Sequence, residues 1–237
     1  MASGACWTGL FWVDLRSCCL RADILRKDTA ATRKRIIDTA ERLFAERGVD
    51  NTSLLDIAKA AQQKNRSALQ YHFTNKQGLL DAVLDKHAKG IAEYRVTMLD
   101  QLESEGSFSL YQLIEVLVLP VAAQLDDADG GHAFLRIHSQ LMTSERYREL
   151  RAHRDKDATD IQRLNIMIVR CINTNNPEII GARLLLMGAL MIHGLAGYLS
   201  QADRISRPVF LHAIIQGIVD LLQQPDSPDP RSLPVDL

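Results

Sequence analysis

Apolar residues recur at helical spacing along most of the chain, and this pattern predicts a protein built of helices. In the segment Thr32–Arg47 the apolar positions follow the spacing i, i+4, i+7, i+8, which places them on one face of an amphipathic helix: Ile36, Ala40, Leu43 and Phe44. Gly48 comes directly after this segment and is a typical helix stop. Glycine (13) and proline (7) are scarce for 237 residues, which favours helices over a many-stranded sandwich. The sequence therefore predicts an all-α fold.

Two short helices are predicted directly after the first helix. Asn51-Thr52-Ser53 provides side chains that cap a helix N terminus, and the apolar residues that follow predict a helix over 54–61. Residues 62–64 are predicted to form a turn, after which Asn65 caps a second short helix over 66–72. Three helices within about 45 residues, the last two short and joined by a tight turn, indicate a helix-turn-helix unit.

The rest of the chain is predicted to form a larger helical body. A long helix from about Lys76 to Glu103, capped by Thr74-Asn75, leads from the helix-turn-helix unit to a break at Gly106-Ser107. We assign residues 28–76 to the helix-turn-helix domain and residues 77–224 to the helical body. Further helices are expected over residues 110–125 (bent at Pro120), 132–142, 144–173, 177–200 and 208–224.

The two ends of the chain differ from the rest. We expect residues 1–27 to be a disordered leader, or the product of a start codon assigned upstream of the true one. Their apolar part is too short for a membrane helix and lacks the basic start of a secretory signal. Residues 225–237, rich in Pro, Ser and Asp, are expected to be a disordered tail. No membrane contact is expected, and cysteine usage favours the reducing cytoplasm.

Charge is distributed unevenly along the chain. Residues 1–76 contain 13 Lys+Arg and 8 Asp+Glu, whereas the remaining 161 residues contain 15 and 21. A basic front and an acidic remainder suit a protein whose first part meets a polyanion. No GxSxG, Walker-type glycine loop, GxGxxG or HExxH motif is present, and the chain has no CxxC pair or His/Cys cluster at zinc-ligand spacing. We therefore expect no catalytic residues, no metal and no cofactor.

The second short helix of the helix-turn-helix unit carries side chains that can read DNA. On this helix Arg66, Ser67 and Gln70 project outward together, while Leu69 and Phe73 point inward. Arginine can donate two hydrogen bonds to guanine O6 and N7, and glutamine can pair likewise with adenine. A polar helix on the surface of a bundle is the alternative interpretation.

Neighbouring polar residues can contact the phosphates. Tyr71 and His72 can reach phosphate oxygens, and Lys76 lies where the next helix adds its N–H groups and dipole. Thr52 and Ser53 offer a further phosphate contact at the preceding helix start. The complete candidate DNA-binding set is Thr52, Ser53, Lys64, Asn65, Arg66, Ser67, Gln70, Tyr71, His72 and Lys76.

The same region resembles a known family. Residues 33–85 closely resemble the N-terminal domain of TetR-family transcriptional regulators, through Ile36 to Gly48, Thr52-Ser53, Ile57-Ala58, Tyr71-His72-Phe73, Asn75-Lys76 and Leu79-Leu80. The resemblance implies an all-α homodimer in which the helix-turn-helix domain binds operator DNA and the body binds a small inducer. It also implies base contacts by Arg66, Ser67 and Gln70, and phosphate contacts by Tyr71, His72 and Lys76.

The chain departs from the family pattern at two places. The turn Gln62-Gln63-Lys64-Asn65 is one residue longer than usual and lacks the usual glycine. Gln70 stands where the family commonly has tyrosine, which changes the DNA contact that this position would make.

The helical body contains a candidate ligand pocket. Adaptable methionines with a few polar groups suit an apolar or amphipathic ligand. The candidate residues are Leu117, Val121, Phe134, His138, Met142, Met167, Met187 and Leu190. The alternative is that these residues are plain core, with His138 and His193 satisfied there or at an interface.

The last two helices contain a candidate dimer interface. Regulators of this family commonly pair these helices with those of a second copy, and small residues among large ones permit close helix approach. The candidate residues are Leu185, Gly188, Ala189, Ile192, Ala196, Leu199, Phe210, Ile214, Ile218 and Leu221. The alternative is that these helices pack inside one chain.

These features together predict a ligand-responsive transcriptional repressor. We expect a homodimer that binds a palindromic double-stranded operator and is released from it by a small apolar or amphipathic molecule. The alternative is a helical small-molecule-binding protein or enzyme that binds no operator. Salt titration of DNA binding separates the two, because a protein that neutralises several phosphates loses affinity steeply as salt rises.

Overall fold

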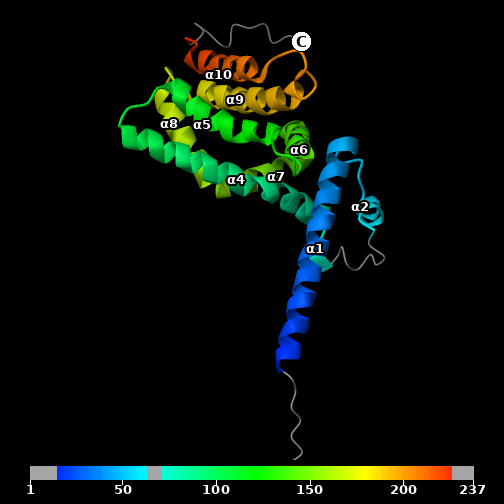
Figure 1. Ribbon diagram of the computed structural model, residues 1–237. Coiled ribbons are helices and arrows are strands. Elements are labelled where there is room, and N and C mark those ends of the chain that lie inside the picture. The colour runs from blue at the N-terminus through cyan, green and yellow to red at the C-terminus, as the bar shows by residue number, and fades with distance from the viewer. Residues whose placement is uncertain (1–14, 63–70, 226–237) are drawn as a thin grey trace, which may run out of the picture.

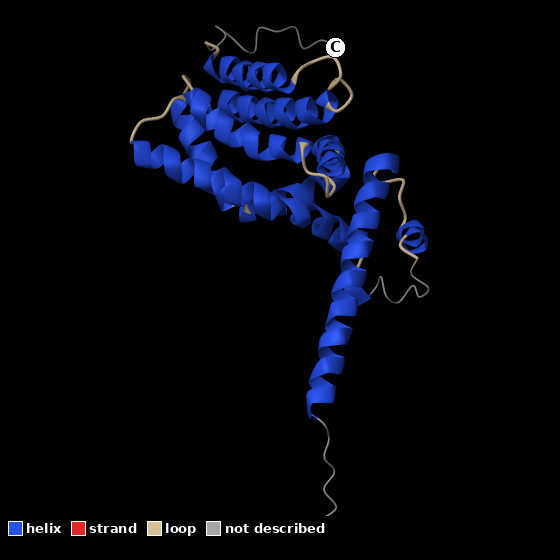
Figure 2. Ribbon diagram, in the orientation of Figure 1, coloured by secondary structure: helices blue, strands red, loops and turns tan. Residues whose placement is uncertain are grey.

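The structure is a computed structural model that describes residues 15–62 and 71–225, and these residues form helices and loops without strands (Figure 2). The predicted all-α class is therefore confirmed. The elements are α1 (Leu15–Arg47), α2 (Leu54–Ala60), α4 (Lys76–Glu105), α5 (Leu110–Ala122), η1 (Ala123–Leu125), α6 (Gly131–Thr143), η2 (Glu145–Tyr147), α7 (Arg148–Asp157), α8 (Thr159–Cys171), α9 (Pro177–Tyr198) and α10 (Arg207–Gln223).

The helices divide into a small N-terminal unit and a larger layered body (Figure 1). In the N-terminal unit, α1 packs against α2 and α4. In the body, α5 packs against α4, α8 and α10, while α9 packs against α6 and α10. The long helix α4 begins at the predicted domain boundary, residues 76–77, and contacts both α1 and α5, so it joins the two parts.

The core of the N-terminal unit comes from the apolar faces that the sequence predicted. Ile36 and Phe44 of α1, Ile57 of α2 and Leu79 and Leu80 of α4 are all fully buried. Burial of each such side chain contributes about 1.5–3 kcal/mol relative to exposure, so this cluster holds the three helices together.

The helix starts in this unit also agree with the sequence. Ser53 caps α2 in a reciprocal capping box with Asp56. Asn75 caps α4, and its side-chain oxygen accepts from the Gly78 N–H at 2.8 Å. Both predicted caps are confirmed.

The first helix is longer than expected. It begins at Leu15, so the expectation of a disordered leader is wrong for residues 15–27, while residues 1–14 lie outside the described part of the chain. Residues 15–47 contain no glycine or proline, and nothing in the segment stops a helix before Thr32. The early part of α1 extends away from the body (Figure 1). The predicted disordered tail falls almost wholly on residues 226–237, outside the described residues.

The expected single helix over 144–173 is wrong, because the chain forms η2, α7 and α8 there. The break between α7 and α8 lies at Ala158, whose φ of −81° and ψ of 72° are not helical. The segment contains no glycine or proline that would mark this break. After the break, α8 packs against α5 and buries Leu164 and Ile168 in the body. Tertiary packing therefore decides this boundary.

One helix among the described residues, α9, is long and apolar enough to cross a membrane. A core helix of a globular protein can pass the same test of length and composition. Here Met187, Met191 and Leu195 of α9 are buried within the body, and α9 packs against α6 and α10.

Candidate nucleic-acid interface

The described part of the predicted recognition helix is its C-terminal end. Tyr71 and His72 are helical and precede the start of α4. The other candidates on this helix and in its turn lie outside the described residues: Lys64, Asn65, Arg66, Ser67 and Gln70. Their roles remain predictions.

The end of this helix is anchored by one aromatic residue and exposes another. The Phe73 side chain is buried as predicted, with the Arg33 guanidinium 5.2 Å from the centre of its ring. Tyr71 is 80% exposed and meets the His72 ring edge-on at 5.2 Å between ring centres. Burial and the charge of Arg33 lower the pKa of His72, so a neutral imidazole is expected at pH 7. In that form it can donate a hydrogen bond to a phosphate without contributing charge.

Of the two candidates at the start of α2, only Ser53 is exposed. Thr52 is 1% exposed, and its hydroxyl lies 2.9 Å from the Gly48 carbonyl oxygen and 3.2 Å from that of Leu43. The Thr52 hydroxyl therefore stabilises the turn after α1, and the predicted phosphate contact of its side chain is wrong. The Ser53 contact remains a prediction.

Lys76 lies at the start of α4 but is engaged within the chain. Its ammonium donates to the Asp50 carbonyl oxygen at 3.3 Å and lies 6.0 Å from the centre of the Phe44 ring. Burial lowers the pKa of Lys76, and the Asp50 charge opposes that shift. Its predicted phosphate contact requires the ammonium to turn toward the duplex.

The turn after α2 takes a strained conformation at a residue other than glycine. Gln62 has a φ of 54°, in the left-handed region, at the start of the turn where the sequence lacks the family's glycine. A non-glycine residue in this region costs about 1–2 kcal/mol. The Gln62 N–H donates to the Lys59 carbonyl at 3.1 Å, and this backbone hydrogen bond forms a turn directly after α2.

The body holds the end of α1 through polar contacts that the sequence did not indicate. Gln140 of α6 accepts from the Val49 N–H at 3.0 Å and donates to the Phe44 carbonyl at 3.3 Å. Just beyond, the Asp50 carboxylate accepts from the Tyr147 hydroxyl at 2.7 Å and from Arg146 at 3.1 Å. Burial and the contact with Asp50 raise the pKa of Tyr147 to about 12. These contacts tie the turn before α2 to the body.

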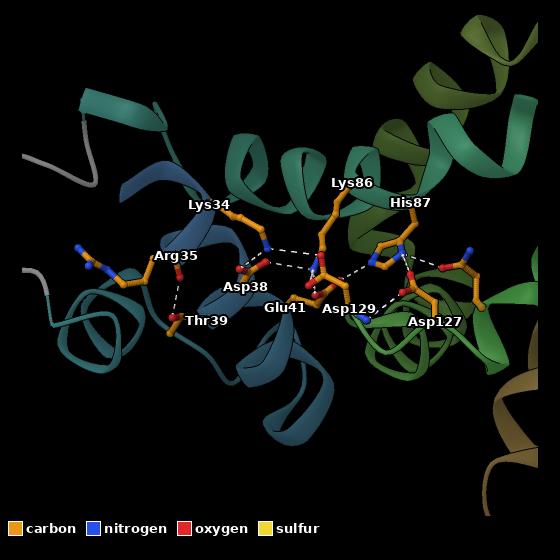
Figure 3. A network of polar contacts seen from close by, with 10 residues as sticks. Lys34, Arg35, Asp38, Thr39, Glu41, Lys86, His87, Asp127 and Asp129 are labelled. Carbon is orange, nitrogen blue, oxygen red and sulfur yellow. Dashed lines mark hydrogen bonds and ion pairs between the residues drawn. The ribbon is translucent and has the colours of Figure 1, made fainter. Parts of the chain in front are cut away.

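A second set of contacts between the two parts forms a polar network, shown in Figure 3. We call it the interdomain network; its members are Lys34, Asp38, Glu41, Lys86, His87, Gln124, Asp127 and Asp129. The Lys86 ammonium donates to Glu41 at 2.7 Å, Asp38 at 3.0 Å and Asp129 at 3.1 Å. Burial lowers the pKa of Lys86, but these bonds outweigh it and raise the pKa overall.

The loop between η1 and α6 comes very close to α1 in this network. A Cβ atom on Gly130 would lie 2.1 Å from a Glu41 carboxylate oxygen, and the Gly130 φ is +100°. Only glycine fits there without displacing Glu41. The loop is exposed, yet its Asp127 and Asp129 carboxylates lie within reach of His87 and Lys86 and so belong to the interdomain network.

The predicted ligand pocket is mostly core in the structure. Of its candidates, Leu117, Val121, Phe134, Met167 and Met187 are buried and Met142 is partly buried. Leu190 is 41% exposed on the outer side of α9, so its assignment to an interior pocket is wrong. An open groove of about 610 Å³ lies elsewhere, between α1 and the segment 125–136.

His138 is the polar member of the predicted pocket. Its Nδ1 atom is buried and has no hydrogen-bond partner among the described residues, so the expectation of a satisfied histidine is wrong. The His138 ring meets the Phe134 ring edge-on at 5.4 Å between centres. Burial, aided by the charge of Arg154, lowers the pKa of His138 to about 4. His193 is satisfied, with Nδ1 2.6 Å from the Ser139 hydroxyl.

His138 is expected to make the fold sensitive to acid. The unfolded chain binds a proton on this residue below about pH 6.5, whereas the folded chain resists it down to about pH 4. Stability should therefore fall by roughly 2 kcal/mol between pH 7 and pH 5 through this residue. We measure the free energy of unfolding by urea denaturation at pH 7 and pH 5. In His138→Leu the decrease between the two pH values should be smaller by this amount, whereas His153→Leu, on the exposed face of α7, should show the wild-type decrease. Equal acid sensitivity in both variants would contradict the assignment.

The predicted dimer interface divides in two. Ile192, Ile214 and Ile218 are buried within the chain, so their assignment to an interface is wrong. The face they occupy is the side of α9 and α10 that packs on the body. The remaining candidates are exposed or partly exposed: Leu185, Gly188, Ala189, Ala196, Leu199, Phe210 and Leu221.

The exposed face of α9 also includes apolar residues that the sequence prediction omitted or misplaced. Leu185 is 68% exposed, and Leu186 and Leu190 are also exposed beside it. On α10, Val209 is exposed, and a Cβ on Gly217 would lie 3.9 Å from Leu190, so the two helices share this face. Apolar residues lie on two sides of α9, and only packing shows which side the body covers.

The core of α1, α2 and α4, followed on its exposed side by the helical residues Tyr71 and His72, is the arrangement expected of a helix-turn-helix unit. Residues 36–83 match the family model "Bacterial regulatory proteins, tetR family". The N-terminal region of the chain is therefore similar to the tetR family of regulators over these residues.

Named relatives match the same region. TtgR of Pseudomonas putida, an HTH-type transcriptional regulator, is 45% identical over 60 residues, which are 25% of this chain and 28% of TtgR. AcrR of Shigella flexneri, also an HTH-type transcriptional regulator, is 38% identical over 96 residues, 39% of this chain and 41% of AcrR. The chain thus matches less than half the length of these relatives.

Solved structures extend the likeness to the body. NalD of Pseudomonas aeruginosa, the secondary repressor of an efflux pump, is 21% identical with a TM-score of 0.57 over 84% of this chain and 98% of NalD. FadR of Bacillus halodurans, a fatty acid degradation regulator, is 16% identical with a TM-score of 0.55 over 81% and 94%. These TM-scores show that the fold is shared.

Proposed function

We propose that this chain is a ligand-responsive transcriptional repressor that binds palindromic operator DNA as a homodimer in the cytoplasm. The observation that carries the proposal is the N-terminal unit, where a buried core holds α1, α2 and α4 and leaves Tyr71 exposed at the end of the predicted recognition helix. Two such units on a dimer would enter successive major grooves, about 34 Å apart. The named relatives that share this unit are transcriptional regulators.

The exposed face of α9 and α10 supports the dimer. Leu185, Leu186 and Leu190 of α9 and Val209 of α10 are all exposed in the isolated chain. Large exposed apolar patches commonly mark protein–protein contacts. A second copy that packs its own α9 and α10 there would form a four-helix interface with twofold symmetry.

The body supports a small apolar or amphipathic inducer. Phe134, Met167 and Met187 provide an apolar surface, and His138 has a buried nitrogen without a partner among the described residues. A ligand that offers a hydrogen bond to His138 would satisfy this atom. The dimer can adopt one arrangement in which the spacing of its two DNA-binding units fits the operator and another in which it does not. The ligand can release DNA only if it binds the second arrangement more tightly than the first.

The test is a selection of DNA fragments by the purified full-length chain from a random pool. An inverted repeat among the retained fragments supports a dimeric operator-binding protein. Affinity for the selected site should also fall steeply as salt rises. In a plot of the logarithm of the binding constant against the logarithm of the salt concentration, each neutralised phosphate makes the slope steeper by about 0.9. Absence of binding at low salt would favour a helical small-molecule carrier instead.

Arg66→Ala is expected to weaken the preference for the selected site over random DNA. Loss of a bidentate contact to guanine costs about 1–3 kcal/mol of discrimination, which is roughly 5- to 150-fold. Lys76→Ala should instead weaken all sequences alike and lower the salt slope by about one. Arg170→Ala, on the exposed surface of α8, is the matched control for Arg66→Ala. If Arg66→Ala and the control behave alike in competition binding, Arg66 does not read bases.

A further inference from the structure

His87 lies buried where the DNA-binding unit meets the body, and both of its ring nitrogens face oxygen atoms. Nε2 is 2.6 Å from a Glu41 carboxylate oxygen on α1. Nδ1 is 2.7 Å from the side-chain oxygen of Gln124 in η1 and 3.3 Å from the Asp127 carboxylate in the loop. The Phe134 ring of α6 lies 4.8 Å from the His87 ring and brings no charge (Figure 3 shows the polar partners).

The protonation state of His87 decides whether all these contacts are favourable. A neutral imidazole has one N–H and one lone pair, whereas an imidazolium donates from both nitrogens. If Nε2 carries the only proton, the Nδ1 lone pair faces the Asp127 carboxylate. If Nδ1 carries it, the Nε2 lone pair faces the Glu41 carboxylate at 2.6 Å. Rotation of the Gln124 amide can offer an N–H to Nδ1, but neither carboxylate can become a donor while ionised.

The charge around His87 favours the same state. The interdomain network contains four carboxylates: Asp38, Glu41, Asp127 and Asp129. Its two ammonium groups, Lys34 and Lys86, leave an excess of two negative charges when His87 is neutral. Protonation of His87 halves that excess at a buried position, where charges interact more strongly than in water.

These contacts join separate parts of the molecule. Glu41 belongs to the DNA-binding unit, and Gln124 and Asp127 belong to the connection that leads into α6. His87 itself lies on α4, the helix shared by both parts. A stronger bond between His87 and this connection would therefore hold the body more firmly against α1.

We propose that His87 is a proton-binding site that fastens the body to the DNA-binding unit, so that acidification tightens the contact between the segment 124–131 and α1. Through this contact pH would also alter operator affinity, a consequence that rests on the proposed function. Near neutral pH histidine is the side chain most readily switched between charge states.

The experiment measures amide hydrogen exchange of the segment 124–131 in the full chain at pH 5.5 and pH 8, corrected for the intrinsic dependence of exchange on pH. A charge-assisted hydrogen bond is worth enough to change local opening by about tenfold or more. We expect protection in the wild-type chain to be about tenfold greater at pH 5.5. In His87→Gln the corrected protection should be the same at both pH values. A purely structural role of His87 would shift protection equally at both.

A matched control and a second variant complete the test. His132→Gln removes an exposed histidine that directly follows the segment, whose Nε2 bonds to the Leu125 carbonyl, and should keep the wild-type pH dependence. Asp127→Asn leaves His87 in place but removes the carboxylate that faces Nδ1, and should reduce the dependence. The proposal is overturned if His87→Gln retains the wild-type difference between the two pH values. If only Asp127→Asn retains it, the Asp127 carboxylate has no part in the effect.

Operator binding at the same two pH values separates this proposal from the proposed function. If the wild-type chain binds no operator at either pH, the proposed function fails while the exchange result still decides the role of His87. If it binds, its affinity should change with pH by a factor that His87→Gln abolishes. Identical pH dependence of binding in wild type and His87→Gln would overturn the link to DNA.

Discussion

Replacing Leu185 and Leu190 with glutamate in one chain is expected to convert the proposed homodimer into a monomer. Both side chains belong to the exposed face of α9, where they are 68% and 41% exposed in the isolated chain. A twofold interface would bury each of them twice, four leucines in all. Their partial exposure corresponds to about 3–6 kcal/mol of lost burial, before the cost of desolvating four carboxylates is added. The dimer dissociation constant should therefore rise by at least about 100-fold.

The measurement is the molar mass in solution by light scattering over a range of concentrations. Ile166→Glu is the matched control, because Ile166 is 56% exposed on α8 and lies outside the α9–α10 face. It should remain dimeric and keep operator affinity. The double variant should lose operator affinity by about 100-fold or more, since a monomer engages one half-site at a time. A double variant that stays dimeric would show that another surface forms the interface.

Asp160→Ala is expected to destabilise the fold by about 3–5 kcal/mol, the usual cost of leaving one partner of a buried ion pair uncompensated. The Asp160 carboxylate of α8 accepts a hydrogen bond from the Arg95 guanidinium of α4, and their exposures are only 8% and 4%. Burial lowers the pKa of Arg95, and the contact with Asp160 opposes that shift. The Arg95 Nε atom has no partner among the described residues, so removal of Asp160 leaves the guanidinium still less satisfied.

Replacing both partners tests the cause of this loss. Arg95→Met with Asp160→Leu removes both buried charges and should recover most of the stability, to within about 1–2 kcal/mol of wild type. Glu145→Ala breaks the exposed pair with Arg148 and should cost less than about 1 kcal/mol. Urea denaturation at pH 7 measures all three. If Asp160→Ala costs no more than Glu145→Ala, the buried pair contributes nothing to stability.

The helix starts and the core of the N-terminal unit could be predicted because their causes lie close together in the sequence. Ser53 and Asp56 cap α2 across three residues, and Asn75 caps α4 in the same way. The apolar spacing from Ile36 to Phe44 is a local property of one helix, and both residues are fully buried. The resemblance over residues 33–85 depends on the same local patterns, and the match over 36–83 confirms it.

The sequence predictions for the dimer interface were wrong where two sides of a helix have similar composition. On α9 and α10, apolar residues occur on the buried side and on the exposed side, so periodicity could not separate Ile192 from Leu186. The sequence predicts Leu190 in a pocket, yet its side chain is exposed on the surface. In the same way, the helix-favouring residues before and after Ala158 gave no local reason for a break.

The sequence by itself determined the all-α class, the caps and the helix-turn-helix unit, because each depends on contacts between residues a few positions apart. Only the tertiary structure decided which face of α9 is free and where α7 ends. It alone brought Glu41, His87 and Asp127 together, because the last of these lies 86 residues beyond the first. Contacts at such separation depend on how α4 and α6 pack against α1, and helix packing has no counterpart in the spacing of residues along a single helix.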